Sequence, residues 1–339
     1  MKLDASLGTE GDYLRGIGRT ARAAENLGFS GLWTSETKHD AFLPLAIAAN
    51  ETHEIELGTS VAIAFSRSPM ETAQTAWDLQ DLSDGRFVLG LGTQVKAHIT
   101  RRFSMPWDRP AARLREYILA LRAIWESFQF EGSLNFEGDF YRHTLMTPFF
   151  DPGPIEHPEI PIYIAGVNTR LARLAGEACD GFHVHPFHSP EYVRETVKPA
   201  IAEGAAGAGR APEQVTLATS AFVITGENGE ETAERRESAR SQISFYASTP
   251  TYRMVLKAHG WEEVGARLGT MSREKKWREM PALITDEMLA VFAVEAAPDE
   301  IGPALRERYE DLIDRVALYL PFVPGEHDEF WRTVVESTR

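Results

Sequence analysis

Short apolar runs alternate along the chain with segments in which apolar side chains recur every three or four positions. The runs are typical of β-strands and the recurring positions of amphipathic helices. The run Glu56–Ala64 is rich in β-branched residues and alanine and carries no charge after Glu56, as is usual for a strand buried on both faces of a parallel sheet. Eight strands are predicted, at Lys2–Leu7, Gly31–Thr34, Glu56–Ala64, Phe87–Leu91, Ile162–Ala165, Gly181–Val184, Val215–Ile224 and Val316–Leu320.

The segments between these strands carry apolar stripes with helical spacing. After the third strand, Pro69 opens a helix at a position where its missing N–H costs nothing. The stripes are Leu14, Ile17, Ala21, Ala24 and Leu27 after the first strand, Ala73, Ala76, Trp77 and Gln80 after the third, and Leu114, Tyr117, Ile118, Leu121, Trp125 and Phe128 after the fourth. Eight strand–helix units without a break in composition favour a (β/α)8 TIM barrel over the alternative, a doubly wound open sheet. We expect residues 1–339 to form a single domain.

Three stretches are longer than a minimal barrel needs. Gln94–Arg109 follows the fourth strand, Gln129–Pro161 contains a hairpin-like segment at Phe136–Tyr141, and Ser248–Asp286 follows the seventh strand. Long loops in a compact barrel are usually lids or binding loops. The predicted fold is therefore a barrel with insertions after strands 4 and 7.

Charge and composition narrow the range of partners. The 35 Lys and Arg against 50 Asp and Glu give a formal net charge of −15, which disfavours nucleic acid or an anionic membrane surface as a partner. No apolar run is long enough to span a membrane. The single Cys179 excludes an intrachain disulfide and favours a cytoplasmic location. The basic cluster Arg273–Arg278 is either a solvated helix face or a patch for an anionic ligand.

Candidate catalytic residues follow the second strand, because active sites of such barrels lie at the C-terminal ends of strands. Glu36 and His39 stand there. Histidine titrates near neutrality and a carboxylate can orient it, so this pair could exchange a proton with a substrate. The alternative is a pair of solvated loop residues.

A helix start after the fifth strand is a candidate phosphate site. Gly166, Val167 and Asn168 precede the helical stripe of Leu171 and Leu174. Backbone N–H groups at a helix start suit a phosphate, whereas the Asn side chain could instead serve only as an N-cap.

The sixth strand carries His183 and His185, with His188 nearby. Residues two apart on a strand point the same way, so a metal site is conceivable, with His39 and Asp40 as further ligands. No spacing here is diagnostic of a metal, and hydrogen bonding to an anion or a substrate is the favoured interpretation.

Four blocks of sequence carry a resemblance to a known family. They are Ala24–Glu36 (AENLGFSGLWTSE), Leu57–Ala62 (LGTSVA), Leu82–Thr93 (LSDGRFVLGLGT), and Pro161–Gly166 (PIYIAG) followed by Ala178–Phe182 (ACDGF). In this order and spacing the chain resembles the luciferase-like monooxygenase superfamily and, within it, the coenzyme F420-dependent oxidoreductases. The resemblance implies a (β/α)8 barrel that binds a flavin or deazaflavin at its C-terminal mouth.

The resemblance also implies roles for particular residues. The Ser60–Val61 peptide is expected to be cis, in a bulge that, with Ala62, backs the tricyclic ring. Glu36 matches an acidic residue of the family, and Thr93 would lie at the polar rim of the ring. The segment Gly166–Asn168 stands at the family's phosphate-binding loop, where His183 and His185 could assist. Gln94 and Val95 stand where family members often have an acidic catalytic residue, so sugar-phosphate dehydrogenase chemistry is not expected.

The resemblance implies three candidate functions. The first is an F420-dependent oxidoreductase that moves a hydride between the deazaflavin and a small organic substrate, with Glu36 or His39 handling the proton. Arg101, Arg102 or the cluster Arg273–Arg278 could hold the acidic tail of F420. The second is an FMN-dependent monooxygenase supplied by a separate cofactor reductase, and the third is a non-catalytic cofactor-binding relative. A homodimer through the helices after strands two and three is expected in each case.

Overall fold

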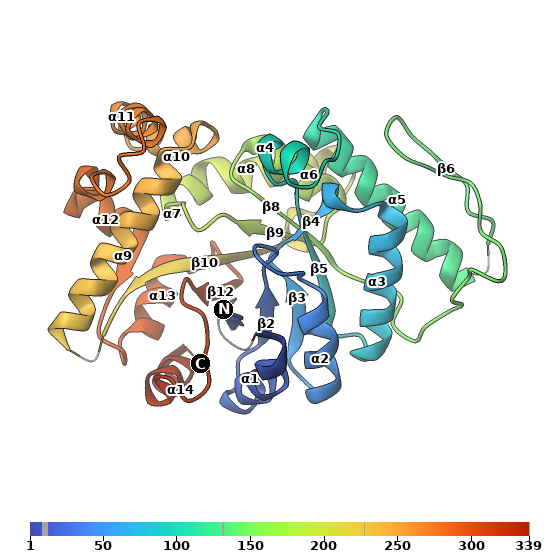
Figure 1. The fold of residues 1–339 in the computed structure, drawn as a ribbon, viewed down its shortest axis with the longest axis horizontal. Helices are drawn as coiled ribbons and strands as arrows, with labels where there is room; N and C mark the ends of the chain where they lie inside the picture. The colour runs from blue at the N-terminus through green and yellow to red at the C-terminus, as the bar shows by residue number, and fades with distance from the viewer. Residues whose placement is uncertain (9–12, 131, 227, 339) are drawn as a thin grey trace.

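Eight parallel strands close into a barrel in the computed structural model, which describes residues 1–8, 13–130, 132–226 and 228–338 (Figure 1). In order around the barrel they are β1 (Lys2–Ser6), β2 (Gly31–Thr34), β3 (Glu56–Thr59), β5 (Phe87–Gly92), β8 (Ile162–Gly166), β9 (Gly181–Val184), β10 (Thr216–Ile224) and β12 (Arg315–Leu318). Pairing of β12 with β1 closes the ring, with Lys2 beside Arg315. The TIM barrel is confirmed and the open sheet is excluded.

Two short strands depart from the predicted set. The third predicted strand is divided, because β3 ends at Thr59 and β4 (Ala62–Ile63) resumes the pairing with β5. An additional strand, β11 (Ala293–Glu295), pairs with the C-terminal part of β10. At three residues, β11 is too short for its apolar pattern to distinguish it from a loop.

Helices cover the outside of the barrel. They are α1 (Tyr13–Leu27), α2 (Leu43–Glu51), α3 (Pro69–Leu82), α5 (Pro110–Phe130), α6 (Thr169–Ala178), α7 (Pro190–Tyr192), α8 (Lys198–Gly207), α13 (Ile301–Tyr309) and α14 (Asp328–Thr338). The predicted stripes of α3 and α5 are buried throughout, with Trp77 and Tyr117 among the largest buried side chains. In the predicted stripe of α1, Ile17, Ala21 and Ala24 are buried, whereas the side chain of Leu14 is 40% exposed, because it lies in the first turn of α1, before the residues that pack on the sheet.

The insertions form short elements of their own. The first contains α4 (Lys96–Arg101), and the segment after α5 contains a hairpin of β6 (Phe136–Glu137) and β7 (Arg142–His143). Beyond β10 follow α9 (Gly229–Ala247), α10 (Arg253–Lys257), α11 (Glu262–Arg273) and α12 (Asp286–Phe292). Figure 1 shows these four helices on the opposite side of the barrel from α3, α5 and the hairpin. In the described part of the chain, no helix has the length and apolar character that crossing a membrane requires.

A buried ion network joins three strands inside the barrel. Arg315 on β12 donates from Nε and Nη2 to the two carboxylate oxygens of Asp4 on β1, both at 2.9 Å, and from Nη1 to Glu56 on β3. Its guanidinium carbon lies 5.1 Å from the ring centroid of Trp33. Burial alone would raise the pKa of Glu56, but Arg315 and Lys2 lower it below the usual value. A Cβ on Gly31 would lie 2.5 Å from Nη2 of Arg315, so the network needs glycine there.

Removing the guanidinium tests how far the barrel depends on this network. We expect Arg315→Met to lower the free energy of unfolding by about 3–5 kcal/mol, because Asp4 is left as an uncompensated buried charge. Urea denaturation followed by circular dichroism measures the change. Arg122→Met is the matched control, since Arg122 pairs with Asp180 where the two side chains are 42% and 38% exposed, and such pairs contribute less than about 1 kcal/mol. Equal losses for the two variants would contradict the assignment.

Candidate functional site

The third strand is interrupted by a bulge at the C-terminal mouth of the barrel. Gly58 pairs with Val88 and Ala62 with Leu91, so strand three carries one more residue than β5 over this interval. The Ser60–Val61 peptide bond within the bulge is cis, as the family resemblance predicts. The hydroxyl of Thr59 donates to the Gly90 carbonyl at 2.6 Å and accepts from the Gly90 N–H at 2.9 Å. This side chain therefore links the two strands at the point where regular pairing stops.

Glycines on β5 make room for the bulge. A Cβ on Gly90 would overlap the carbonyl oxygen of Thr59 and would lie 3.1 Å from Nε2 of His183. A Cβ on Gly92 would lie 2.6 Å from Cγ2 of Val61. The Gly-Leu-Gly sequence of β5 thus forms a shallow cradle against which the bulge packs.

Glu36, at the end of β2, is bonded to both sides of the bulge. Its backbone N–H donates to the Val61 carbonyl at 3.2 Å, and its Oε2 accepts from the Ile63 N–H at 2.7 Å. Its side chain is 6% exposed. The predicted catalytic carboxylate is therefore held by the backbone of strand three.

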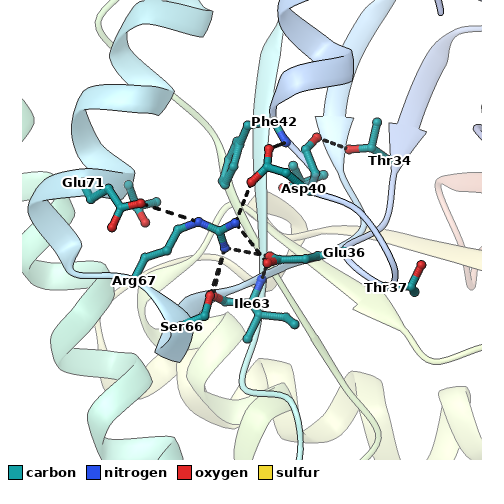
Figure 2. A network of polar contacts seen from close by, with 12 residues as sticks. Thr34, Glu36, Thr37, Asp40, Phe42, Ile63, Ser66, Arg67 and Glu71 are labelled. Carbon is teal, nitrogen blue, oxygen red and sulfur yellow. Dashed lines mark hydrogen bonds and ion pairs between the residues drawn. The ribbon is translucent and has the colours of Figure 1, made fainter. Parts of the chain in front are cut away.

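Arg67 completes this arrangement as a bidentate partner of Glu36 (Figure 2). Its Nη1 lies 2.7 Å from Oε2 and its Nη2 lies 3.0 Å from Oε1, while Nη2 also donates to Asp40 at 2.8 Å. Its guanidinium carbon lies 5.1 Å from the ring centroid of Phe42. Burial alone would lower the pKa of Arg67, but bonding to Glu36 and Asp40 raises it, so the cation persists.

Asp40 fixes the loop that follows β2. Its Oδ1 accepts from the backbone N–H groups of Phe42 and Leu43 at 2.8 and 2.9 Å. His39 lies on the same loop with its side chain exposed. Of the two predicted proton-handling residues, Glu36 is thus enclosed by partners and His39 is open to solvent.

The ends of β5 and β8 supply the other predicted binding residues. Thr93 is half-buried and its hydroxyl donates to the Gln94 carbonyl at 3.1 Å. Asn168 is the N-cap of α6, and its Oδ1 accepts from the Leu171 N–H at 3.1 Å. The hydroxyl of Tyr192 donates to the Val167 carbonyl at 2.7 Å. The cap uses one amide of the first helical turn, and the positive end of α6 is directed toward the mouth.

His183 lies inside the barrel with an unsatisfied ring nitrogen. Its ring centroid lies 5.1 Å from that of Trp33 and 5.4 Å from that of Tyr163. The Nε2 atom is buried and has no hydrogen-bond partner among the described residues. Burial, together with Arg315, lowers the pKa of His183 to about 3. His183 is therefore neutral and retains an unused hydrogen-bonding nitrogen.

His185, two residues further, lies among aromatic rings at the mouth. Its ring centroid lies 4.6 Å from that of Tyr246 and 4.5 Å from that of Tyr252. Its Nδ1 accepts from the Phe187 N–H at 3.1 Å. Burial and the neighbouring His188 lower the pKa of His185 to about 3.

The structure gives no support to the metal interpretation of these histidines. His188 is bonded to the His185 carbonyl at 2.9 Å and to the Tyr309 hydroxyl at 3.1 Å. Within the described ranges, the one group with metal-ligand spacing is Asp84, Glu156 and His157. These three side chains are exposed, and Asp84 precedes β5, at the end of the barrel opposite the mouth.

Two features of the mouth were not predicted from the sequence. Arg67 is the one charged residue between Glu56 and Glu71, and an isolated charge in an apolar stretch is a signal for a buried ion pair. Tyr246 and Tyr319 come together at the mouth with their hydroxyl oxygens 2.7 Å apart. They are separated by more than seventy residues, and no local pattern could have paired them.

The predicted basic groups lie outside the bulge. Arg102 donates to the Thr37 carbonyl at 2.5 Å and its guanidinium carbon lies 4.9 Å from the ring centroid of Phe103. In the cluster Arg273–Arg278, Lys276 is paired with Glu274 at 2.8 Å. Arg102 thus joins the first insertion to the loop after β2.

Known proteins of similar sequence lend support to the predicted family. An uncharacterized protein of Mycobacterium tuberculosis is 45% identical over 316 residues, covering 93% of this chain and 92% of that protein. The 5,10-methylenetetrahydromethanopterin reductase of Methanolobus tindarius is 27% identical over 318 residues, covering 91% of each.

Solved structures share the fold. The coenzyme F420-dependent tetrahydromethanopterin reductase of Methanopyrus kandleri superposes with a TM-score of 0.79 at 20% identity, covering 99% of this chain and 97% of that one. The oxygenating constituent of 3,6-diketocamphane monooxygenase from Pseudomonas putida, solved with FMN, gives 0.67 at 16% identity, covering 99% and 97%. The profile of the luciferase-like monooxygenases matches residues 1–315, and the chain therefore belongs to that family.

Proposed function

We propose that this protein is an oxidoreductase that binds coenzyme F420 at the barrel mouth and transfers a hydride between the deazaflavin and a small organic substrate. The observation that carries the proposal is the bulge at Ser60–Ala62, seated on Gly90 and Gly92 and held by Glu36 and Arg67. Because the bulge presents backbone and small side chains, its surface is flat enough to pack against the face of a tricyclic ring. The F420-dependent reductase of the same fold and the methanopterin reductase relative support this choice of cofactor.

Other residues of the mouth fit the remaining parts of such a cofactor. The start of α6 at Gly166–Asn168 offers amide donors and a positive helix end for a phosphate. The buried Nε2 of His183 can hydrogen-bond to a polar ring atom, and Thr93 can do so from the rim. When bound, the deazaflavin supplies the carbon that gives or accepts the hydride, and the protein's contribution is to orient it and exclude water.

We assign different tasks to the two predicted proton-handling residues. Both oxygens of Glu36 are engaged, by Arg67 and by the Ile63 N–H. Glu36 therefore acts as a positioning residue for the bulge. His39 is exposed on the adjacent loop, where its imidazole can exchange a proton with a substrate.

The second candidate is an FMN-dependent monooxygenase that receives reduced flavin from a separate reductase. The FMN-bound structure of the same fold favours this alternative. Reduced FMN reacts with oxygen, so the two candidates differ in cofactor and in oxygen consumption. Saturable binding without turnover across a broad substrate panel would instead favour a non-catalytic cofactor-binding protein.

We also propose a cytoplasmic homodimer. Helix α2 carries no charged residue before Glu51, and its outer face exposes Leu43 at 57% and Ile47 at 36%. A helix that is apolar on every side is normally covered. A second copy of the chain packed against α2 and α3 would cover it, and sedimentation velocity measures the resulting mass.

Titration with F420 and FMN tests the proposed cofactor. We expect F420 to give saturable quenching of protein fluorescence and FMN to give none, and the reverse result would contradict the first candidate. Gly92→Ala should weaken F420 binding about tenfold, which corresponds to about 1.4 kcal/mol, because the added Cβ displaces Val61. Gly16→Ala is the matched control, since a Cβ there meets nothing within 4 Å, and its affinity for F420 should equal that of the parent.

Glu36→Gln separates a positioning role from a proton-transfer role. The variant keeps an acceptor for the Ile63 N–H but removes the bidentate carboxylate partner of Arg67, whose remaining ion pair at hydrogen-bond distance is with the partly exposed Asp40. We therefore expect the free energy of unfolding to fall by about 2 kcal/mol and F420 affinity to fall with it. The double variant Glu36→Gln/Arg67→Met also removes the buried cation that has lost its bidentate partner and should recover part of the stability. Urea denaturation and F420 titration provide the two readouts. Unchanged stability and affinity in Glu36→Gln would contradict the positioning role.

A further inference from the structure

Five aromatic residues form a cluster at the barrel mouth, which we call the mouth aromatic cluster: His185, Phe222, Tyr246, Tyr252 and Tyr319. They come from the end of β9, from β10, from α9, from the short 3₁₀ helix Pro250–Tyr252 and from the residue after β12. His185 contacts Tyr246 and Tyr252, as described above. In addition, the ring centroids of Phe222 and Tyr319 lie 4.7 Å apart, and those of Tyr246 and Tyr252 lie 6.2 Å apart. The cluster is continuous, and Tyr319 is 37% exposed.

The cluster lies across the mouth from the bulge. The order of strands around the barrel places β3 and β10 four positions apart in a ring of eight, so these two strands are diametrically opposed. The bulge ends β3, whereas Phe222 lies on β10 and its neighbours come from β9 and β12. If the bulge backs the cofactor, the opposite wall is left to the substrate.

The cluster carries no net charge at neutral pH. The pKa of His185 is lowered to about 3 by burial and by His188, so the imidazole is neutral. Burial raises the pKa of Tyr252, and burial together with Tyr319 raises that of Tyr246. Arg235 on α9 lines the same small pocket as Phe222 and Tyr319, and its charge is paired with that of Glu231 at 3.6 Å.

Besides the Tyr252 hydroxyl and the His185 imidazole, this largely apolar wall carries one pair of bonded hydroxyl groups. The Tyr246 and Tyr319 oxygens are 2.7 Å apart and share one hydrogen bond. Two hydroxyls bring two hydrogens, and their mutual bond uses one. Among the described residues neither hydroxyl has another partner, so the second O–H can donate to a neutral acceptor that enters the mouth.

We propose that the mouth aromatic cluster binds an uncharged, flat aromatic carbonyl compound, with the ring packed on the cluster and the carbonyl oxygen bonded to the Tyr246–Tyr319 hydroxyl pair. This assignment rests on the proposed function, since it makes the wall opposite the cofactor the substrate site. Aromatic rings favour offset or edge-to-face packing with other flat rings. A charged substrate would lose its hydration against this wall without gaining a counter-ion, which is unfavourable.

Four small probes separate the parts of this assignment. Acetophenone is flat, neutral and carries the carbonyl; ethylbenzene lacks the acceptor, cyclohexyl methyl ketone is not flat, and 4-acetylbenzoate is an anion. Isothermal titration of the full chain saturated with F420 should show that acetophenone binds at least about fivefold more tightly than each of the other three. Tighter binding of 4-acetylbenzoate, or equal binding of all four probes, would overturn the proposal.

Removal of one hydroxyl gives the decisive comparison. Tyr319→Phe keeps the ring and should weaken acetophenone binding about three- to tenfold while leaving ethylbenzene within about twofold. Tyr117→Phe is the matched control, because its hydroxyl contacts Thr72 in the core, and it should leave both probes unchanged. Equal effects of Tyr319→Phe on acetophenone and ethylbenzene would overturn the hydroxyl assignment.

Titration of the same variants with F420 distinguishes failure of this inference from failure of the proposed function. Tyr319→Phe should bind F420 with the parent affinity. If F420 binds and the four probes do not differ, the substrate assignment is wrong and the cofactor assignment stands. If F420 fails to bind, the titration is run without it. Selective binding of acetophenone in that case would uphold the aromatic carbonyl site and overturn the cofactor.

Discussion

The ion pair between Glu36 and Arg67 is the constraint on which the barrel mouth depends. Strand three leaves regular pairing at Thr59 and resumes it at Ala62, so the backbone between them needs partners from outside the sheet. Glu36 provides them on both sides, through Val61 and Ile63. A buried carboxylate is costly unless its charge is compensated, and Arg67 supplies that compensation with two hydrogen bonds. The conformation of the bulge thus depends on one charge from the loop after β4.

The bulge also needs space, which the glycines of β5 provide, and a neutral histidine lies next to them. Gly90 and Gly92 leave the space that Thr59 and Val61 occupy. His183 reaches the vicinity of Gly90 from β9, and its low pKa keeps it uncharged beside this crowded backbone. A second compensated network, of Arg315, Asp4 and Glu56, lies near the N-terminal end of the barrel. The mouth therefore combines one compensated ion pair, Glu36 with Arg67, with polar backbone groups and neutral histidines.

The periodic parts of the fold could be predicted from the sequence, whereas the contacts of the site could not. The eight strands follow from short apolar runs, and the buried faces of α3 and α5 follow from residues such as Trp77 and Tyr117. These signals are local, since each depends on spacing within one element. Arg67 and Glu36 lie thirty-one residues apart, and their pairing is a property of the closed barrel. The cis peptide could be expected only from the family resemblance, because no spacing rule encodes it.

The two walls of the mouth differ in origin, and this difference bears on function. The bulge wall is built from Ser60–Ala62 and β5, which lie within the segments that carry the family resemblance, and it is held by the pair of Glu36 and Arg67, of which Arg67 lies outside those segments. The opposite wall takes Tyr246 and Tyr252 from α9 and the 3₁₀ helix after it, near the insertion that follows the seventh strand. Loops on a rigid scaffold can change without disturbing the strands that they connect. The side chains of the insertion can therefore change while the backbone of the bulge stays the same, and in the assignment proposed above the aromatic rings and the hydroxyl pair are the part of the mouth that selects the substrate.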